Sequence, residues 1–298
     1  MKFNSTLIIN TIAENFKSSR VYDVSADPLP RNSIEYYWVW ILQNCGEFGL
    51  FLIFYLAMAI LYAIGGIVFY LFDKFKLFPS RKIQIKKYPS SYEIRRCINN
   101  LVINYITIIL PLGIISFPFS KVLGLTHDLP LPTIWKFLLD IFLCLLGEDF
   151  FHYWMHRFFH TPWFYKNIHK EHHYFSAPFG FTASYAHPVE VVFLGIATFA
   201  PAFILRPHYI TFYSWFIVRQ LDAVLTHSGY DIELFPFNFM PYYGGTVFHD
   251  YHHKQFTCNY GSRFTYLDKL FNTYKEKPTK IPSSEPSNNS LSNNKKQS

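Results

Sequence analysis

The sequence predicts an all-α integral membrane protein of about four to five hydrophobic helices, in two hairpin-like pairs, with a cytosolic helical domain rich in histidine. Half of the 298 residues are hydrophobic and only 16% are charged, whereas soluble domains average about 25% charged residues. The apolar residues lie in blocks long enough to cross a bilayer, which takes roughly 20 residues. Twelve of the 13 histidines lie between His152 and His253.

The same composition excludes several classes of protein. A disordered chain or a coiled coil would lack such apolar blocks, and no basic-aromatic groove pattern indicates a nucleic-acid partner. The four cysteines are far apart and form no C-x-x-C pair, which excludes a disulfide-rich secreted domain. The net charge of +7 is therefore attributed to membrane topology.

Five apolar blocks are candidate membrane segments. The clearest contains no charge, the next contains Pro111 and Pro118, which predict a kink or an end, and the third becomes polar at Glu148. The last two are each short for a full crossing, so two crossings and a partial hairpin both remain open. In chain order the blocks are 48–72, 97–119, 133–156, 189–205 and 209–225.

The loops predict the orientation of these segments. Residues 73–97 hold eight basic and two acidic residues, and such basic loops stay in the cytosol. The neutral loop 120–132 then faces the opposite side, and counting the crossings returns 152–188 and 226–298 to the cytosol. The chain ends in Lys295-Lys296-Gln297-Ser298, which resembles a retrieval signal for the endoplasmic reticulum, and Asn4 begins a sequon that would be lumenal. We therefore predict a multi-pass protein of the endoplasmic reticulum membrane, with its histidine clusters and C-terminus in the cytosol.

Four regions follow from these assignments. Residues 1–47 form an N-terminal segment, and 48–133 contain membrane helices and the cytosolic basic loop. Residues 134–275 form the histidine-rich domain. The tail 276–298 is polar and rich in Pro, Ser and Asn, which predicts disorder.

The histidines have the spacing of metal ligands. His152, His156 and His160 lie four residues apart, and two H-x-x-H-H runs follow at 169–173 and 249–253. Residues i and i+4 share a helix face, so the three imidazoles of an H-x-x-H-H run on a helix can converge. Because one ion takes four to six ligands and eight to ten histidines are available, the pattern predicts two metal ions held by nitrogen.

Four histidines lie outside these runs. His127 in the opposite loop and His208 in the hairpin turn are expected to be bystanders, whereas His187 and His227, at the cytosolic ends of their segments, remain open as ligands. A nitrogen-rich dimetal centre beside a membrane suits oxygen chemistry on a lipid, and iron supports redox chemistry that zinc does not. The chain has no flavin or haem motif, so the electrons must come from another protein.

The three clusters resemble the histidine boxes of the sterol desaturase and fatty acid hydroxylase superfamily, and most closely those of C-4 methylsterol monooxygenases. The similar stretches are 156–180, 184–190, 225–232 and 248–271, within a region of about 134–275 that would be the catalytic domain. The resemblance implies O2-dependent oxidation of the C-4 methyl group of 4-methyl or 4,4-dimethyl sterols at two irons. Electrons would come from NAD(P)H through cytochrome b5 and its reductase.

The resemblance also ranks the ligands. His156-Arg157-Phe-Phe-His160 matches the first box better than the register that begins at His152, and His227 and His187 gain weight. Where fatty acid hydroxylases have a further histidine this chain has Asp231, which would bind metal or orient a ligand. Asp149 and Asp250 are expected to orient ligands or to be helix-end charges, and not to bind metal. The expected metal ligands are His156, His160, His169, His172, His173, His249, His252, His253, His227, His187 and His152.

Other functions remain open at this stage. A C-5 sterol desaturase or a sterol or alkyl-lipid hydroxylase would use the same iron centre. A metal transporter would place histidines within its membrane spans, and the first four segments have none in their apolar cores. A sterol-binding relative without activity is the third alternative.

Overall fold

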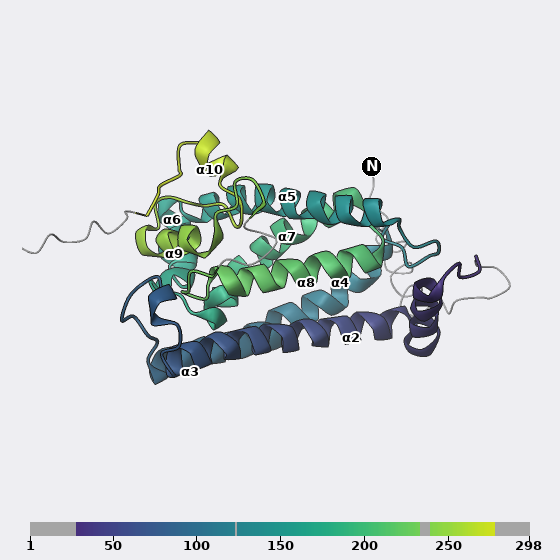
Figure 1. Cartoon of the computed structure of the whole chain (residues 1–298), viewed down its shortest axis with the longest axis horizontal. Coiled ribbons are helices and arrows are strands. Elements are labelled where there is room, and N and C mark those ends of the chain that lie inside the picture. The colour runs from purple at the N-terminus through teal and green to yellow at the C-terminus, as the bar shows by residue number, and fades with distance from the viewer. Residues whose placement is uncertain (1–27, 123, 233–238, 278–298) are drawn as a thin grey trace, which may run out of the picture.

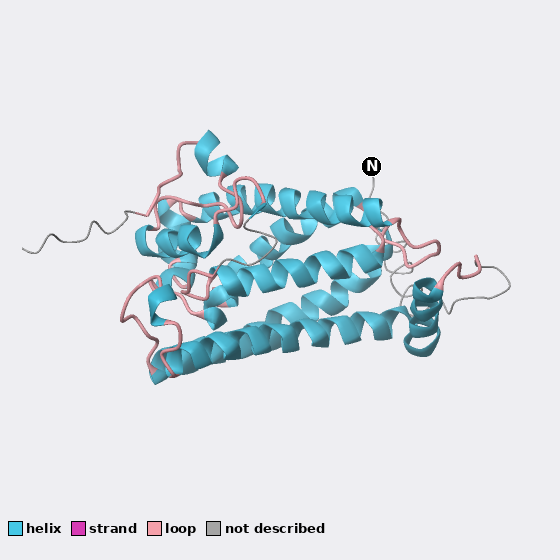
Figure 2. Ribbon diagram, viewed as in Figure 1, coloured by secondary structure: helices cyan, strands magenta, loops and turns pink. Residues whose placement is uncertain are grey.

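The computed structural model describes residues 28–122, 124–232 and 239–277, and this part of the chain is helical (Figures 1 and 2). No strand occurs in it; only two isolated bridges pair Lys82 with Tyr230 and Tyr243 with Phe264. The predicted all-α class is therefore confirmed for these residues. The Asn4 sequon, the C-terminal lysines and nearly all of the predicted tail 276–298 lie outside the described residues.

The longest helices run side by side along the longest axis of the molecule, and short helices gather at one end of them (Figure 1). The long helices are α2 (Ser33–Lys74), α3 (Ser91–Asn104) continued by the π-helical turn Tyr105–Ile109 and α4 (Leu110–Val122), α5 (Ile134–Phe159), α7 (Pro188–Leu205) and α8 (Tyr209–Thr226). The short ones are α6 (Pro162–Phe164), a π-turn Tyr165–His169, 3-10 turns Pro79–Arg81, His172–Tyr174 and Gly180–Ser184, α9 (Gly245–Gln255) and α10 (Tyr266–Leu270).

Helix α2 is broken near its start. Asn32 caps it by accepting from the Ile34 and Glu35 N–H groups, and Gly46 interrupts it with φ 64° and ψ 170°, a conformation that glycine adopts readily. The remainder, 47–74, coincides with the uncharged block predicted at 48–72. It is about 42 Å long at 1.5 Å per residue, more than the roughly 30 Å of a hydrocarbon core.

The second predicted block starts earlier than expected. Ser90 and Glu93 form a capping box, so the helix begins at Ser91 instead of Cys97. The irregularity that Pro111 predicts is the π-helical turn Tyr105–Ile109 just before it, because proline lacks the N–H that an α-helix needs there. Pro118 lies inside α4 without ending it.

Three helices of the described part are long and apolar enough to cross a membrane: α2, the continuous 91–118 and α7. Helices α5 and α8 carry more charge, most of it buried against neighbouring elements, as with Glu148 and Asp222. Helix α5 approaches α7 closely at Gly147, where a Cβ would lie 2.7 Å from the Pro201 Cβ.

Helices α7 and α8 form an antiparallel hairpin whose turn lies far from the short helices. Arg206 ends α7 in the left-handed region, and Tyr209 begins α8 beside His127, with ring centroids 3.7 Å apart. His208 packs on Trp38 at the start of α2. His127 and His208 therefore lie together at the end of the bundle opposite the histidine clusters.

Candidate metal centre

Nine imidazoles gather into two groups at the end of the bundle that carries α6 and α9. Within each group the candidate ligand nitrogens all lie within 4.8 Å of one another. The nine side chains are buried except that of His160, which is half-buried. One group contains His156, His160, His169, His173 and His252; the other contains His172, His227, His249 and His253.

Each H-x-x-H-H run is divided between the groups. His169 and His173 point into the five-histidine group while His172 points into the other, and in the second run His252 is the one that crosses. The three imidazoles of a run therefore do not converge on one group. On an α-helix the histidine before the last is rotated by about 100° from the last and about 60° from the first. In both runs it points toward the neighbouring group.

The backbone that carries the runs is less regular than predicted. The second run is α-helical, at 249–253 within α9, but the first passes from the π-turn that ends at His169 into the 3-10 turn that begins at His172. His156 lies in the last turn of α5, and His160 and His227 are the C-cap residues of α5 and α8. Five separate elements thus converge on the same place.

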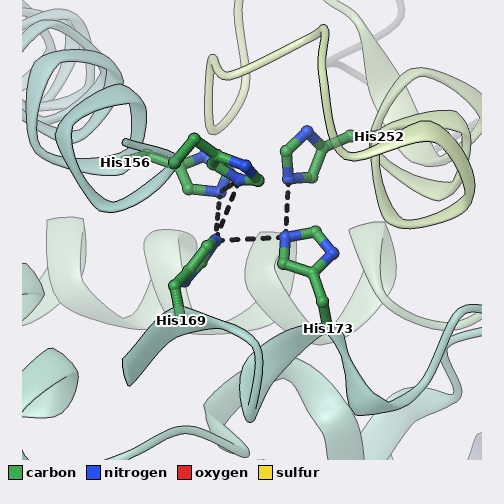
Figure 3. Close-up of side chains that lie close together, drawn as sticks. His156, His169, His173 and His252 are labelled. Atoms are coloured by element: carbon green, nitrogen blue, oxygen red, sulfur yellow. Dashed lines mark hydrogen bonds between the residues drawn. The ribbon is translucent and has the colours of Figure 1, made fainter. Parts of the chain in front are cut away.

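Short contacts between nitrogens connect the rings (Figure 3). In the five-histidine group the Nε2 of His169 lies 3.1 Å from those of His156 and His173 and 3.0 Å from that of His160. His252 closes the group with its Nε2 3.1 Å from that of His173. In the other group the Nε2 atoms of His227 and His249 are 2.9 Å apart.

The outer nitrogens of four imidazoles identify their tautomer. A carbonyl oxygen only accepts, so an Nδ1 facing one carries the proton and leaves the Nε2 lone pair free. His156 donates in this way to Tyr260 at 2.8 Å and His252 to Cys258 at 2.6 Å. His172 donates to Tyr185 at 2.8 Å and His227 to Ala223 at 2.9 Å. Two such lone pairs in each group face the other rings, an arrangement that suits a cation between them.

Burial keeps these rings neutral. Desolvation, and then the neighbouring imidazoles, lower the pKa values of His173, His249 and His253 well below that of a free histidine. Both ring nitrogens of His253 are buried without a hydrogen-bond partner among the described residues, which is costly for a polar group unless a ligand supplies the interaction. The donor set, neutral and all-nitrogen, therefore fits two transition-metal ions.

Glu190 is a site residue that the sequence reasoning missed. Its Oε1 lies 2.8 Å from the Nδ1 of His169, and both side chains are fully buried. It is the one carboxylate that contacts any of the nine imidazoles among the described residues. Its signal in the sequence is the single charge in the first turn of the otherwise apolar 188–205.

Two predicted ligands do not join either group. His187 is half-buried and caps α7, its Nδ1 accepting from the Val189 N–H at 3.2 Å. His152 lies one turn before His156, with ring centroids 5.3 Å apart, and its Nδ1 is 3.9 Å from Glu148. His227, by contrast, lies inside the four-histidine group.

The three aspartates expected to orient ligands have other partners. Asp149 accepts from the backbone N–H groups of Arg263 and Phe264, and Asp250 accepts from the Gln84 amide. Asp231 is exposed, and its N–H donates to the Arg81 carbonyl. Asp149 therefore fixes the loop after α9, and Asp250 fixes the loop after α2.

Buried ion pairs hold the surroundings of the centre in place. The Arg263 guanidinium, 1% exposed, contacts Glu148 of α5 at 3.2 Å and Asp222 of α8 at 2.9 Å. On the other side Arg96 of α3 donates to the Tyr185 hydroxyl at 2.7 Å and to Glu171 at 3.0 Å. The Tyr185 carbonyl also accepts from His172. Helix α3 therefore helps to position the His172 imidazole through Tyr185, the residue that contacts both.

Comparison with known proteins agrees with this geometry. The fatty acid hydroxylase family matches residues 141–273. A very-long-chain aldehyde decarbonylase (GL1-11) of Oryza sativa subsp. indica is 40% identical over 241 residues, covering 78% of this chain and 90% of that protein. Methylsterol monooxygenase 1-1 of Arabidopsis thaliana is 42% identical over 202 residues, covering 67% and 68%.

A putative methylsterol monooxygenase of Dictyostelium discoideum is 40% identical over 243 residues, covering 80% of this chain and 89% of that protein. No solved structure matches the chain. The matched family region includes all nine imidazoles of the two groups and Glu190. The chain belongs to the fatty acid hydroxylase superfamily, a family of oxidoreductases.

Proposed function

We propose that this chain is a membrane-bound non-haem diiron monooxygenase that oxidises the C-4 methyl group of 4-methyl or 4,4-dimethyl sterols. The observation that carries the proposal is the division of nine neutral imidazoles into two adjoining groups. Methylsterol monooxygenases recur among the relatives at 35–42% identity. The catalytic unit would be 134–275, which contains the matched family region.

The nine imidazoles would hold two irons, five around one ion and four around the other. Iron bound there would supply the redox chemistry that O2 activation needs. The protein contributes the fixed tautomers of four rings, the buried carboxylate behind His169, and a frame of buried ion pairs that limits movement of the ligands.

Cosubstrates and location complete the proposal. O2 would be the oxidant. Electrons from NAD(P)H would pass through a reductase to cytochrome b5 and from there to the metal centre. The protein would lie in the endoplasmic reticulum membrane, with the metal centre and the C-terminus on the cytosolic side. The three candidate membrane helices support a membrane location, and the basic loop after α2 supports the orientation.

A second candidate function has a specific observation in its favour. This chain matches 90% of the length of a relative that is named a very-long-chain aldehyde decarbonylase. A long-chain aldehyde must therefore be tested beside the sterol. A transporter is less favoured because the nine imidazoles gather at one end of the bundle instead of along a path through it.

Product analysis separates these functions. Membranes containing the protein, supplied with O2, NADPH, cytochrome b5 and its reductase, are given 4,4-dimethyl sterol, 4-desmethyl sterol or a long-chain aldehyde. We expect mass spectrometry to show C-4 alcohol, aldehyde and carboxylate products from the 4,4-dimethyl sterol alone. Turnover of only the desmethyl sterol or only the aldehyde would contradict the proposal and identify the alternative.

Variants connect the activity to the metal centre. His156→Ala and His227→Ala each remove a proposed ligand from one group. Each should lower turnover by more than the 10–100-fold typical of losing an outer partner and reduce the iron content below two ions per chain. The matched control is His187→Asn, which keeps an N-cap side chain on α7 and should retain iron and turnover. Loss of iron from the control would return His187 to the ligand set.

A further inference from the structure

The segment Lys74–Lys87, which connects α2 to α3, carries positive charge without local neutralisation. No Asp or Glu occurs between residues 74 and 92. Five of its cations are exposed, and none of the five pairs with a carboxylate among the described residues. They are Lys74, Lys76, Arg81, Lys86 and Lys87.

Large apolar side chains are exposed between these cations. Phe75 is 62% exposed, Phe78 56% and Ile85 56%. Water-facing loops seldom present such a group of apolar side chains, and exposed patches of this kind mark contact with a partner or a membrane. Alternation of cations with exposed aromatic and aliphatic side chains is typical of segments that lie at a lipid headgroup layer.

The position of the segment fits the same layer. It begins where one candidate span, α2, ends and finishes before the next, which starts at Ser91. Two adjacent spans leave the bilayer at its ends, so the residues between them lie at headgroup level. In Figure 1 this loop extends from the end of α2 toward α9.

The middle of the segment is bound to the rest of the protein, whereas the cations on either side of it are exposed. Lys82, the buried lysine, pairs with Asp73 at 2.5 Å, and its ammonium lies 4.4 Å from the Tyr230 ring centroid. The Ile83 N–H donates to the Gly229 carbonyl, and the Gln84 amide donates to Asp250 and to the Ser176 carbonyl. The exposed cations on either side of these contacts are thereby held in a fixed layout.

We propose that the segment Lys74–Lys87 is a binding surface for acidic phospholipid headgroups, with Phe75, Phe78 and Ile85 entering the acyl boundary. A cation near a membrane surface interacts with acidic lipid by about 1 kcal/mol, or about fivefold in affinity. The apolar side chains favour a lipid over an acidic soluble protein. This surface is independent of the metal centre and of the substrate.

Native mass spectrometry of the full-length protein tests the proposal without turnover or metal. Detergent-solubilised protein is titrated with dioleoyl-phosphatidylserine or dioleoyl-phosphatidylcholine, and lipid adducts are counted. We expect a clear preference for the serine lipid. Lys86→Gln with Lys87→Gln should weaken it roughly 25-fold, at about fivefold per charge. The matched control, Lys166→Gln with Lys269→Gln, removes two exposed cations elsewhere and should bind like the wild type.

Three results would overturn the proposal. Equal binding of the two lipids would favour a protein partner for the segment. An equal loss in the control pair would attribute the effect to net charge. Displacement of the lipid by an equal concentration of water-soluble glycerophosphoserine would identify a soluble phosphate ester as the ligand. None of these results bears on sterol oxidation, so the two proposals fail separately.

Discussion

At the scale of single residues, the position of a histidine within its run decides which group it joins. The first and last members of each H-x-x-H-H run stay together, and the one before the last crosses to the neighbouring group. Each run therefore contributes to both groups, so a shift of α9 would disturb both at once. The two groups also differ, because within the described part of the chain only the five-histidine group has a carboxyl group in contact with one of its imidazoles.

This difference predicts unequal metal affinities. Glu190→Gln keeps the shape of the side chain but replaces the carboxyl group that faces the Nδ1 of His169. Loss of such an outer partner lowers metal affinity 10–100-fold, so we expect iron content to fall from two ions per chain toward one during dialysis against a chelator. Elemental analysis measures the iron, and 57Fe Mössbauer spectroscopy reports the change at the remaining sites.

Asp250→Asn is the matched control for Glu190→Gln. It also replaces a buried carboxyl group close to the centre, but Asp250 accepts from Gln84 and does not face an imidazole. It should retain both irons. If the two variants lost iron equally, general electrostatics would explain the effect, and full retention by Glu190→Gln would remove the role assigned to Glu190.

The residues of the centre were predictable to different degrees. Spacing in the sequence indicated His152 together with the eight histidines of the three boxes, because helical i, i+4 spacing is a local pattern. The resemblance then favoured His156, His160 and His227. His187 lies outside both groups and caps α7, because a histidine before a proline at a helix start also suits an N-cap. Glu190 was missed because its partner, His169, lies 21 residues away, and only the packing of α7 on the π-turn brings them together.

At the scale of elements, the contact between α5 and α7 aligns ligands with Glu190. Helix α5 carries His156, helix α7 carries Glu190, and Gly147 lets the two helices approach closely at Pro201. The apolar pattern predicted both helices, but no periodicity revealed which glycine lies at a helix contact. Pro111 predicted an irregularity where the π-turn Tyr105–Ile109 lies. The π-turn Tyr165–His169 was invisible, since its side chains do not differ from those of an α-helix.

Gly147→Ala should destabilise the protein. Its Cβ would lie 2.7 Å from the Pro201 Cβ, and overpacking of this kind costs about 1–3 kcal/mol. Gly195→Ala on α7 is the matched control, since its Cβ meets nothing within 4 Å, and both changes gain the same helix propensity. The thermal unfolding midpoint in detergent should be lower for Gly147→Ala by several degrees than for Gly195→Ala. Equal midpoints would show that the two helices separate without cost.

At the scale of the whole molecule, the bundle has two chemically different ends. One end has the two histidine groups, the buried Lys82–Asp73 pair and the basic segment Lys74–Lys87. The other has an aromatic cluster around Trp38, His127 and Tyr209. Composition and loop charge predicted this polarity before any contact was known, because segment length and the distribution of lysine and arginine are properties of the sequence alone.

Cysteine labelling tests that polarity directly. Cys45 is exposed and adjoins the kink at Gly46, whereas Cys97, Cys144 and Cys258 are buried. Helix 47–74, about 42 Å long, separates Cys45 from the basic segment.

In sealed endoplasmic reticulum vesicles a membrane-impermeant maleimide should therefore label Cys45 only after detergent is added. Lys86→Cys in a Cys45→Ser background should react without detergent, because Lys86 lies beyond the opposite end of the same helix. If both positions reacted from the same side, residues 47–74 would not cross the bilayer, and the metal centre would lose its assignment to the cytosolic face.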